Sequence, residues 1–350
     1  MATLWFCLVA FMLATYVVLD GFDLGAGALA PLVARTSEER DAVLRSIGPV
    51  WDGNEVWLVA AGGTLYFAFP ALYAASLSGF YLPLMIVLWL LIGRGVSIEL
   101  RHRVDHPVWQ RFWDSIFFVS SLLLAIFYGA ALGNVVRGVP LDAHGRFFLP
   151  LWSDFSLGPP SGILDWYTLL AGVAALAALA LHGALWLTLK VEGAVGERAR
   201  HLAGALSWLV VATTALLTLA SLATQPQIAQ SVAARPWGAV FPLIAVLGLV
   251  GIVFYRSRRR DGHAFLASCA YIAGMLTAVA FGLYPYVLPA RPASELGLTA
   301  TAVAAPVHGL WVGLAWWIPG MLLAAGYFTY VYRSFRGKVS PASKRISSSP

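Results

Sequence analysis

The sequence predicts an all-α polytopic membrane protein of about nine transmembrane helices, with the N-terminus outside and the C-terminus cytoplasmic. Of its 350 residues, 59% are apolar and only 11% are charged, whereas a soluble domain carries roughly 25% charged residues. Apolar runs of spanning length recur along the chain, and the basic residues gather in alternate connections between them. A membrane β-barrel would instead show segments of about ten residues alternating apolar and polar, a pattern that this sequence lacks.

A spanning helix needs about 20 mostly apolar residues, and nine segments meet that need. The first, 2–33, has no basic leader or small-residue cleavage site before it and is therefore expected to stay as an anchor. It would reach about 48 Å, so it must tilt, break near its glycines or protrude. The second, 50–69, opens with charged residues, and the seventh, 237–255, is the shortest. The others are 77–96, 115–136, 166–189, 202–223, 263–287 and 308–332.

Basic residues choose the orientation of such a bundle. Nineteen of the 23 lysines and arginines lie in the first, third, fifth and seventh connections or in the C-terminal tail, with Arg94 assigned to the third connection. The other four are Arg137, Arg146, Arg235 and Arg291. This asymmetry places the odd-numbered connections and the tail in the cytoplasm, and it supports the count of nine. Residues 1–339 are expected to form one integral membrane domain. Residues 340–350, rich in Ser, Pro and Lys, are expected to be a disordered cytoplasmic tail.

Four carboxylates interrupt the first two spans. Asp20 and Asp23 lie in the first, and Asp52 and Glu55 open the second. Each pair is spaced i,i+3 and so shares one helix face. Because the two helices run in opposite directions, all four carboxylates are expected at similar depth in the inner half of the membrane.

Two interpretations of these acids remain open. They mark the membrane interface beside nearby arginines, or they form a proton-conducting cluster, since ionisable groups at bilayer depth usually face a polar interior or a partner. Glycines 21, 25 and 27 would let neighbouring helices approach closely. Further polar or aromatic residues are expected to line a vestibule formed by the first four helices: Trp51, Asn54, Arg94, Glu99 and Asp114.

Histidine and cysteine offer little support for a metal or haem site in this chain. Only His182 and His308 lie within or at the mouth of a span, and no second histidine faces His182 at matching depth in the predicted helices. A lone intramembrane histidine more often bonds a neighbouring helix. Cys7 and Cys269 lie far apart in apolar runs, so neither a disulfide framework nor a thiolate site is expected. The sequence therefore predicts no catalytic residue and no metal ligand in this chain.

Several motifs resemble subunit II of the cytochrome bd quinol oxidases, over nearly the whole chain. They are Asp20-Gly21-Phe22-Asp23-Leu24-Gly25, Trp51-Asp52-Gly53-Asn54-Glu55-Val56-Trp57-Leu58, Gly79-Phe80-Tyr81, Arg94-Gly95-Val96 with Glu99 and Arg101, Trp113-Asp114, Gly133-Asn134, Gly138-Val139-Pro140 and 284–289. The ending 330–339 looks like the cyanide-insensitive branch of that family.

The resemblance implies a bacterial inner-membrane heterodimer of two nine-helix subunits, with a small single-helix subunit as a further candidate partner. Subunit I would bind quinol, two b-type haems and haem d. Subunit II would carry no haem, would scaffold its partner, and would contribute a cytoplasmic proton path at Asp20 and Asp52, with Asp23 and Trp51 nearby. Glu55 stands where other members have Gln, so an ionisable group there need not be required.

Some members of that family are associated with a structural quinone or lipid, which is therefore a candidate ligand. The resemblance also implies that the chain is not catalytic alone, and no nucleic-acid partner is expected. Two other hypotheses compete with the proton path. A stand-alone proton-coupled secondary transporter would favour interrupted half-helices in both halves of the chain, and only the first half shows an interruption. A purely structural subunit would leave the carboxylates inert.

Overall fold

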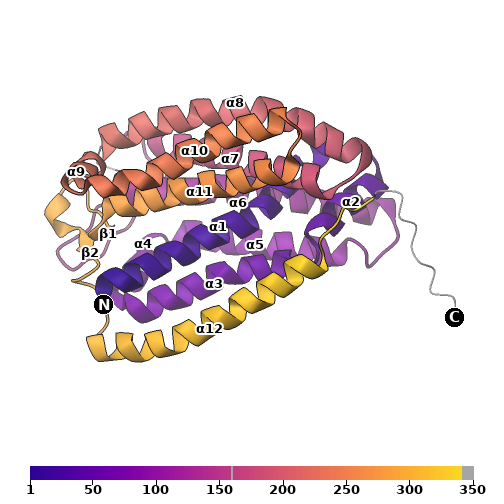
Figure 1. Ribbon diagram of the computed structural model, residues 1–350. Helices are drawn as coiled ribbons and strands as arrows, with labels where there is room; N and C mark the ends of the chain where they lie inside the picture. Colours follow the sequence, from indigo (N-terminus) through magenta and orange to yellow (C-terminus); the bar gives the residue numbers. More distant parts are fainter. Residues whose placement is uncertain (159–160, 341–350) are drawn as a thin grey trace.

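The computed structural model describes residues 1–158 and 161–340 of the chain, so the predicted disordered tail lies outside the described residues apart from Ser340. Long helices running along a common direction dominate it (Figure 1). The α-helices are α1 (Ala2–Val33), α2 (Ser37–Ile47), α3 (Trp51–Ala68), α4 (Pro70–Gly79), α5 (Tyr81–Leu100), α6 (Pro107–Arg137), α7 (Trp166–Lys190), α8 (Gly193–Thr224), α9 (Gln227–Ala234), α10 (Val240–Ser257), α11 (Asp261–Leu283) and α12 (Val307–Ser334). Short 3-10 turns span Pro236–Ala239 and Ser294–Leu296, and strands β1 (Tyr286–Leu288) and β2 (Leu298–Thr299) pair antiparallel.

Eight helices in the described part of the chain are long and apolar enough to cross a membrane, where the sequence predicts nine. The ninth predicted segment, 50–69, is helix α3, which is 18 residues long. Its first turns carry Asp52, Asn54 and Glu55, which make it less apolar than the other eight. It lies in the bundle between α1 and α12 (Figure 1).

Several predicted boundaries are wrong by up to nine residues. Helix α6 begins at Pro107 and α8 at Gly193, well before 115 and 202, because helical hydrogen bonding continues beyond the apolar segment into polar sequence. Helix α11 ends at Leu283, since Pro285 follows it and the chain turns into strand β1.

Helix α1 is central and packs against α3, α6, α7 and α11. Its crossing with α7 is a backbone contact, because a Cβ added at Gly25 would overlap the Leu179 carbonyl, and one added at Gly183 would overlap the Gly25–Ala26 backbone. Gly27 meets the Ser121 side chain of α6 in the same way. The predicted role of the glycines in close helix approach is confirmed.

The apolar pattern predicts a loop at 34–49, but the structure has helix α2 there. Thr36 caps it, and the Glu39 carboxylate bonds back to the Thr36 backbone, a capping box that is legible in the sequence. Partial burial acts to raise the pKa of Glu39, but hydrogen bonds from the Arg35 backbone (2.6 Å) and the Arg198 guanidinium hold it below its ordinary value. Glu39 thereby ties α2 to α8.

The two ends of the bundle differ. The N-terminus lies at one end with α9, β1 and β2, and the C-terminal segment lies at the other with α2 (Figure 1). At this C-terminal end, the backbone at Val339 bonds to Lys190 and Glu192 in the α7–α8 turn, and Arg45 donates to the Ser340 carbonyl at 3.1 Å.

One basic residue assigned to the opposite connection is not a surface charge. Arg137 ends helix α6 with its side chain buried, where it pairs with Asp165 and donates to the Gly162 carbonyl (2.9 Å) and the Asn134 amide oxygen (2.7 Å). Asp165 in turn caps α7, accepting from the backbone N–H groups of Tyr167 and Thr168. Arg137 therefore anchors the long 138–165 connection instead of marking topology.

Candidate functional site

A buried ion pair joins α1 to α5. Arg94 donates to Asp20 through two hydrogen bonds, from Nη1 to Oδ2 at 2.9 Å and from Nη2 to Oδ1 at 2.5 Å, and both side chains are fully buried. Two parallel bonds of this kind fix both partners in orientation as well as in charge. Arg94 is therefore a structural member of the cluster and not a loop charge, which corrects its use in the topology count.

Helix α3 adds a second carboxylate to the same guanidinium. Glu55 Oε2 lies 3.4 Å from Arg94 Nη2, and its side chain is 20% exposed. One arginine thus links three helices, with a fully buried aspartate on one side and a partly exposed glutamate on the other.

Asp23 is held by an amide and not by a cation. Asn54 of α3 donates from Nδ2 to Asp23 Oδ2 at 2.8 Å and to the Leu19 carbonyl at 3.1 Å. The Tyr332 hydroxyl of α12 donates to Asn54 Oδ1 at 2.9 Å. Asp23 Oδ1 is buried and has no hydrogen-bond partner in the described part of the chain, and neither has Arg94 Nε in the same cluster.

Two tyrosines next to this cluster, Tyr16 and Tyr128, are not predicted by the sequence pattern. Tyr16 precedes Asp20 by four residues and therefore shares its helix face, and its hydroxyl donates to the Tyr128 hydroxyl of α6 at 2.8 Å. The i,i+4 spacing of Tyr16 and Asp20 is visible in the sequence, but the partner on α6 is not.

The remaining residues of the first two motifs lie at the rim. Asp52, in the first turn of α3, is exposed and makes no hydrogen bond or ion pair among the described residues. The Trp51 ring packs over Gly95, one residue beyond Arg94, so that a Cβ at Gly95 would meet it at 3.4 Å. Burial thus increases from Asp52 through Glu55 to Asp20.

Two residues expected in the vestibule lie elsewhere. Glu99 follows Arg94 by five residues, about 140° round the helix, and is exposed. Asp114 belongs to a separate network at the C-terminal end, where it accepts from Arg101 Nε at 2.5 Å while the same guanidinium pairs with Asp41 of α2. The unexpected helix α2 brings this second network together.

His182 has no free ring nitrogen with which to bind a haem iron in this arrangement. Nδ1 lies 2.7 Å from the Ser268 hydroxyl of α11, and Nε2 lies 2.9 Å from the Val18 carbonyl of α1. The ring also stacks on Phe265 at 4.8 Å. The residues around His182 therefore do not fit an axial haem site, and within the described ranges no group of three or more His, Cys, Asp and Glu side chains is placed to hold a metal ion.

The cluster of Asp20, Asp23, Asn54, Glu55 and Arg94, called here the buried acid cluster, holds three carboxylates and one guanidinium. If every carboxylate were ionised, its net charge would be −2, and a low-dielectric interior strongly disfavours unbalanced charge. The cluster can therefore take up as many as two protons before it is neutral. What it can do chemically is accept, hold and release protons.

Comparison with known proteins places this chain among respiratory subunits. The family described as "Cytochrome bd terminal oxidase subunit II" matches residues 1–335. "Probable cytochrome oxidase subunit 2" of Haemophilus influenzae is 31% identical, over 96% of this chain and 94% of that protein. "Cytochrome bd ubiquinol oxidase subunit 2" of Bacillus subtilis is also 31% identical, over 96% of each. The fold resembles a chain in the structure of bd oxidase from Geobacillus thermodenitrificans, with a TM-score of 0.75, 22% identity, and coverage of 95% of this chain and 98% of that one.

Proposed function

Because the chain belongs to the cytochrome bd terminal oxidase subunit II family, we propose that its buried acid cluster carries protons from the cytoplasm toward the oxygen-reducing partner subunit. The chain is one subunit of a quinol oxidase and a multi-pass protein of the bacterial inner membrane. Its own share of the activity is proton conduction and scaffolding, within a single integral membrane domain.

The proposal places the N-terminus outside and the C-terminus in the cytoplasm. The excess of basic residues in the odd-numbered connections supports this orientation, and α2 lies with the C-terminal segment at one end of the bundle (Figure 1). Asp52, in the first turn of α3, then faces the cytoplasmic side. Asp20 and Asp23 lie about 20 and 15 Å along α1 from its end at Val33, within the membrane.

The observation that carries the proposal is the gradient of burial from Asp52 to Asp23, which ends at an unpartnered carboxylate oxygen. Asp52 is exposed, the Glu55 side chain is 20% exposed, and Asp23 is 1% exposed with Oδ1 free of partners among the described residues. A carboxylate oxygen without a hydrogen-bond donor is open to a proton, which supports a carrier role for Asp23.

Each residue of the buried acid cluster has its own role in the movement of that proton. Arg94 fixes Asp20 in orientation through two hydrogen bonds. Glu55 takes a proton from water at the partly exposed edge of the cluster. Asp23, whose Oδ1 accepts no hydrogen bond among the described residues, then holds the proton on that oxygen. Asn54 keeps Asp23 in place, and the Tyr332 hydroxyl keeps Asn54 in place.

The partner implied by the family is subunit I of the oxidase. The proposal assigns it the quinol site, two b-type haems and haem d, which supply electron transfer and the reduction of dioxygen to water. A small single-helix subunit is a further candidate partner, and a structural quinone or lipid is a further candidate ligand. Quinol oxidation would release protons outside, and dioxygen reduction would take up protons from the cytoplasm. The two reactions together would separate charge across the membrane without a proton pump.

A stand-alone proton-coupled transporter is not favoured, since the family match extends over residues 1–335. A scaffold with inert carboxylates is the alternative that experiment must separate from the proton path. Asp23→Asn keeps the shape and an acceptor for Asn54 but cannot carry a proton.

The test measures quinol oxidase turnover and the haem spectrum of the purified complex. We expect Asp23→Asn to lower turnover about a hundredfold, with assembly and spectrum retained. Asp52→Asn should lower it less, because water reaches Glu55 directly. The matched control is Asp105→Asn, an exposed loop acid, which should leave turnover unchanged. Unchanged turnover in Asp23→Asn would leave the chain a scaffold only.

A further inference from the structure

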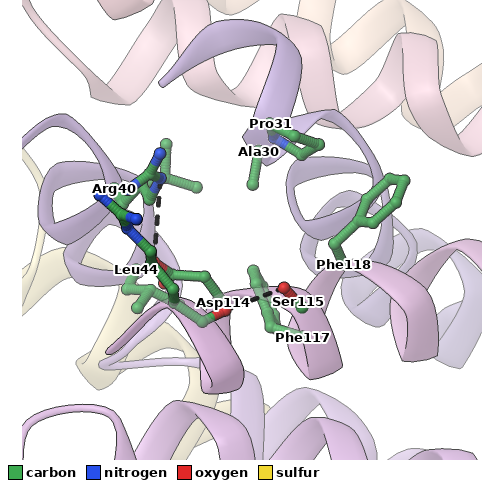
Figure 2. Close-up of a pocket in the computed structure, with 10 residues that line it drawn as sticks. Ala30, Pro31, Arg40, Leu44, Asp114, Ser115, Phe117 and Phe118 are labelled. Carbon is green, nitrogen blue, oxygen red and sulfur yellow. Dashed lines mark hydrogen bonds and ion pairs between the residues drawn. The ribbon is translucent and has the colours of Figure 1, made fainter. Parts of the chain in front are cut away.

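A cleft of about 260 Å³ opens at the C-terminal end of the bundle, between the last turn of α1, helix α2 and the first turns of α6 (Figure 2). It lies apart from the buried acid cluster and shares none of its residues. Its lining has two chemical parts, which come from different elements.

The polar part of the lining contains two arginines, the Ser115 hydroxyl and one carboxylate, that of Asp114. Arg40 of α2 and Arg111 of α6 line the cleft, with the Ser115 hydroxyl one turn beyond Arg111. The Arg111 side chain makes no hydrogen bond or ion pair among residues 1–158 and 161–340. Arg40 Nε lies 3.8 Å from Asp114 Oδ2, a long contact, whereas Asp114 is held at 2.5 Å by Arg101. Asp114 is thus paired more closely with Arg101 than with Arg40. Arg40 and Arg111 therefore leave the cleft with a net positive charge.

The apolar part forms the walls. It consists of Ala30 and Pro31 at the end of α1, Val43 and Leu44 on the buried face of α2, and Phe117 and Phe118 on α6. An anion-binding site for a free ion would not need such walls. They suit a ligand whose charged group is joined to hydrocarbon.

The two parts are ordered along the membrane normal. Arg111, Ser115 and Phe118 follow one another at helical spacing on one face of α6, and Phe118 lies about 10 Å deeper along the helix than Arg111. Helix α2, charged on one side and apolar on the other, has the character of a helix lying at the interface. A phosphate at Arg111 would therefore lie at the level of the headgroups, with hydrocarbon beginning at Phe118.

We propose that this cleft binds the phosphodiester of an anionic membrane phospholipid, with the guanidinium groups of Arg40 and Arg111 on the phosphate and the first acyl carbons against Phe117 and Phe118. Guanidinium forks match phosphate oxygens in geometry as well as charge. The shared chemistry is a phosphate anion, and the lipid is chosen over inorganic phosphate because of the apolar walls.

The test uses the purified, delipidated oxidase complex and native mass spectrometry. The probes are dioleoylphosphatidylglycerol, dioleoylphosphatidylcholine and inorganic phosphate. We expect the wild type to retain phosphatidylglycerol over phosphatidylcholine, and Arg111→Gln to weaken that retention about fivefold, the contribution of one basic residue near an anionic lipid. Arg103→Gln is the matched control, since Arg103 is exposed at the same end and outside the cleft.

A second variant tests the apolar walls of the cleft. Phe118→Ala should weaken retention of phosphatidylglycerol without altering any binding of inorganic phosphate. Displacement of phosphatidylglycerol by millimolar phosphate, with Phe118→Ala having no effect, would assign the site to a free anion and overturn the lipid. Equal retention of both lipids, unaltered by Arg111→Gln, would remove the site altogether.

Discussion

The Asp20–Arg94 pair allows a quantitative test of how the buried acid cluster is held. Asp20→Asn keeps the volume of the side chain but removes its charge. Arg94 is then left inside the bundle with Glu55 as its only acidic contact among the described residues, at 3.4 Å. Breaking one side of a buried pair costs about 3–5 kcal/mol, because the other charge stays buried without compensation.

The lower end of that range applies here. Glu55 remains in contact with Arg94 and, being 20% exposed, replaces part of the lost interaction. We therefore expect Asp20→Asn to lower the free energy of unfolding by about 3 kcal/mol. Arg94→Gln should be at least as harmful, since it leaves Asp20, Asp23 and Glu55 without a cation.

A double-mutant cycle measures the interaction itself. Wild type, Asp20→Asn, Arg94→Gln and the double variant are compared by detergent-induced unfolding of the assembled complex, followed by tryptophan fluorescence. The double variant should lose much less stability than the two single losses combined. Strictly additive losses would show that the two side chains do not interact in the folded protein, and would refute the geometry described above.

Three further outcomes follow from single contacts. Gly183→Ala should lower the free energy of unfolding by about 3 kcal/mol, because its Cβ would overlap the α1 backbone; Gly262→Ala, which meets nothing within 4 Å, is the control, and equal effects would contradict the crossing. Tyr332→Phe removes the donor at 2.9 Å to the Asn54 amide oxygen, so stability should fall by about 1–2 kcal/mol; no change in unfolding would contradict this bond. Glu39, whose pKa is held below its ordinary 4.5, stabilises the fold above pH 4.5, and this contribution is lost as pH falls through its folded value. The stability difference between wild type and Glu39→Gln should therefore be present at neutral pH and vanish in acid; a difference that grows in acid would reverse the sign.

The sequence predicts the long helices well because a membrane span requires a long run of apolar residues, which can be recognised directly. It also places α3 to within one residue at each end, but it misses α2, since the capping box between Thr36 and Glu39 lies in a polar stretch. The i,i+3 spacing correctly brings Asp20 and Asp23 onto a face directed at α3 and α5.

What the sequence could not provide is which residue pairs with which. The sequence groups Arg94 with the loop charges because residues 101, 103 and 111 are arginines too, yet α5 continues past it to Leu100. Glu99 and Asp114 lie near Arg94 in sequence but face other directions. Tyr128 and Tyr332 reach Tyr16 and Asn54 across more than 100 residues of chain, a register that only helix packing determines.

Proton uptake by the complex in sealed vesicles tests the central claim most directly. The oxidase is reconstituted in proteoliposomes, quinol is supplied, and a pH indicator reports proton consumption on the side that carries the C-terminus of this chain. Our account predicts that Asp23→Asn slows uptake on that side about a hundredfold while the haem spectrum is unchanged. Uptake at the wild-type rate in Asp23→Asn would contradict it.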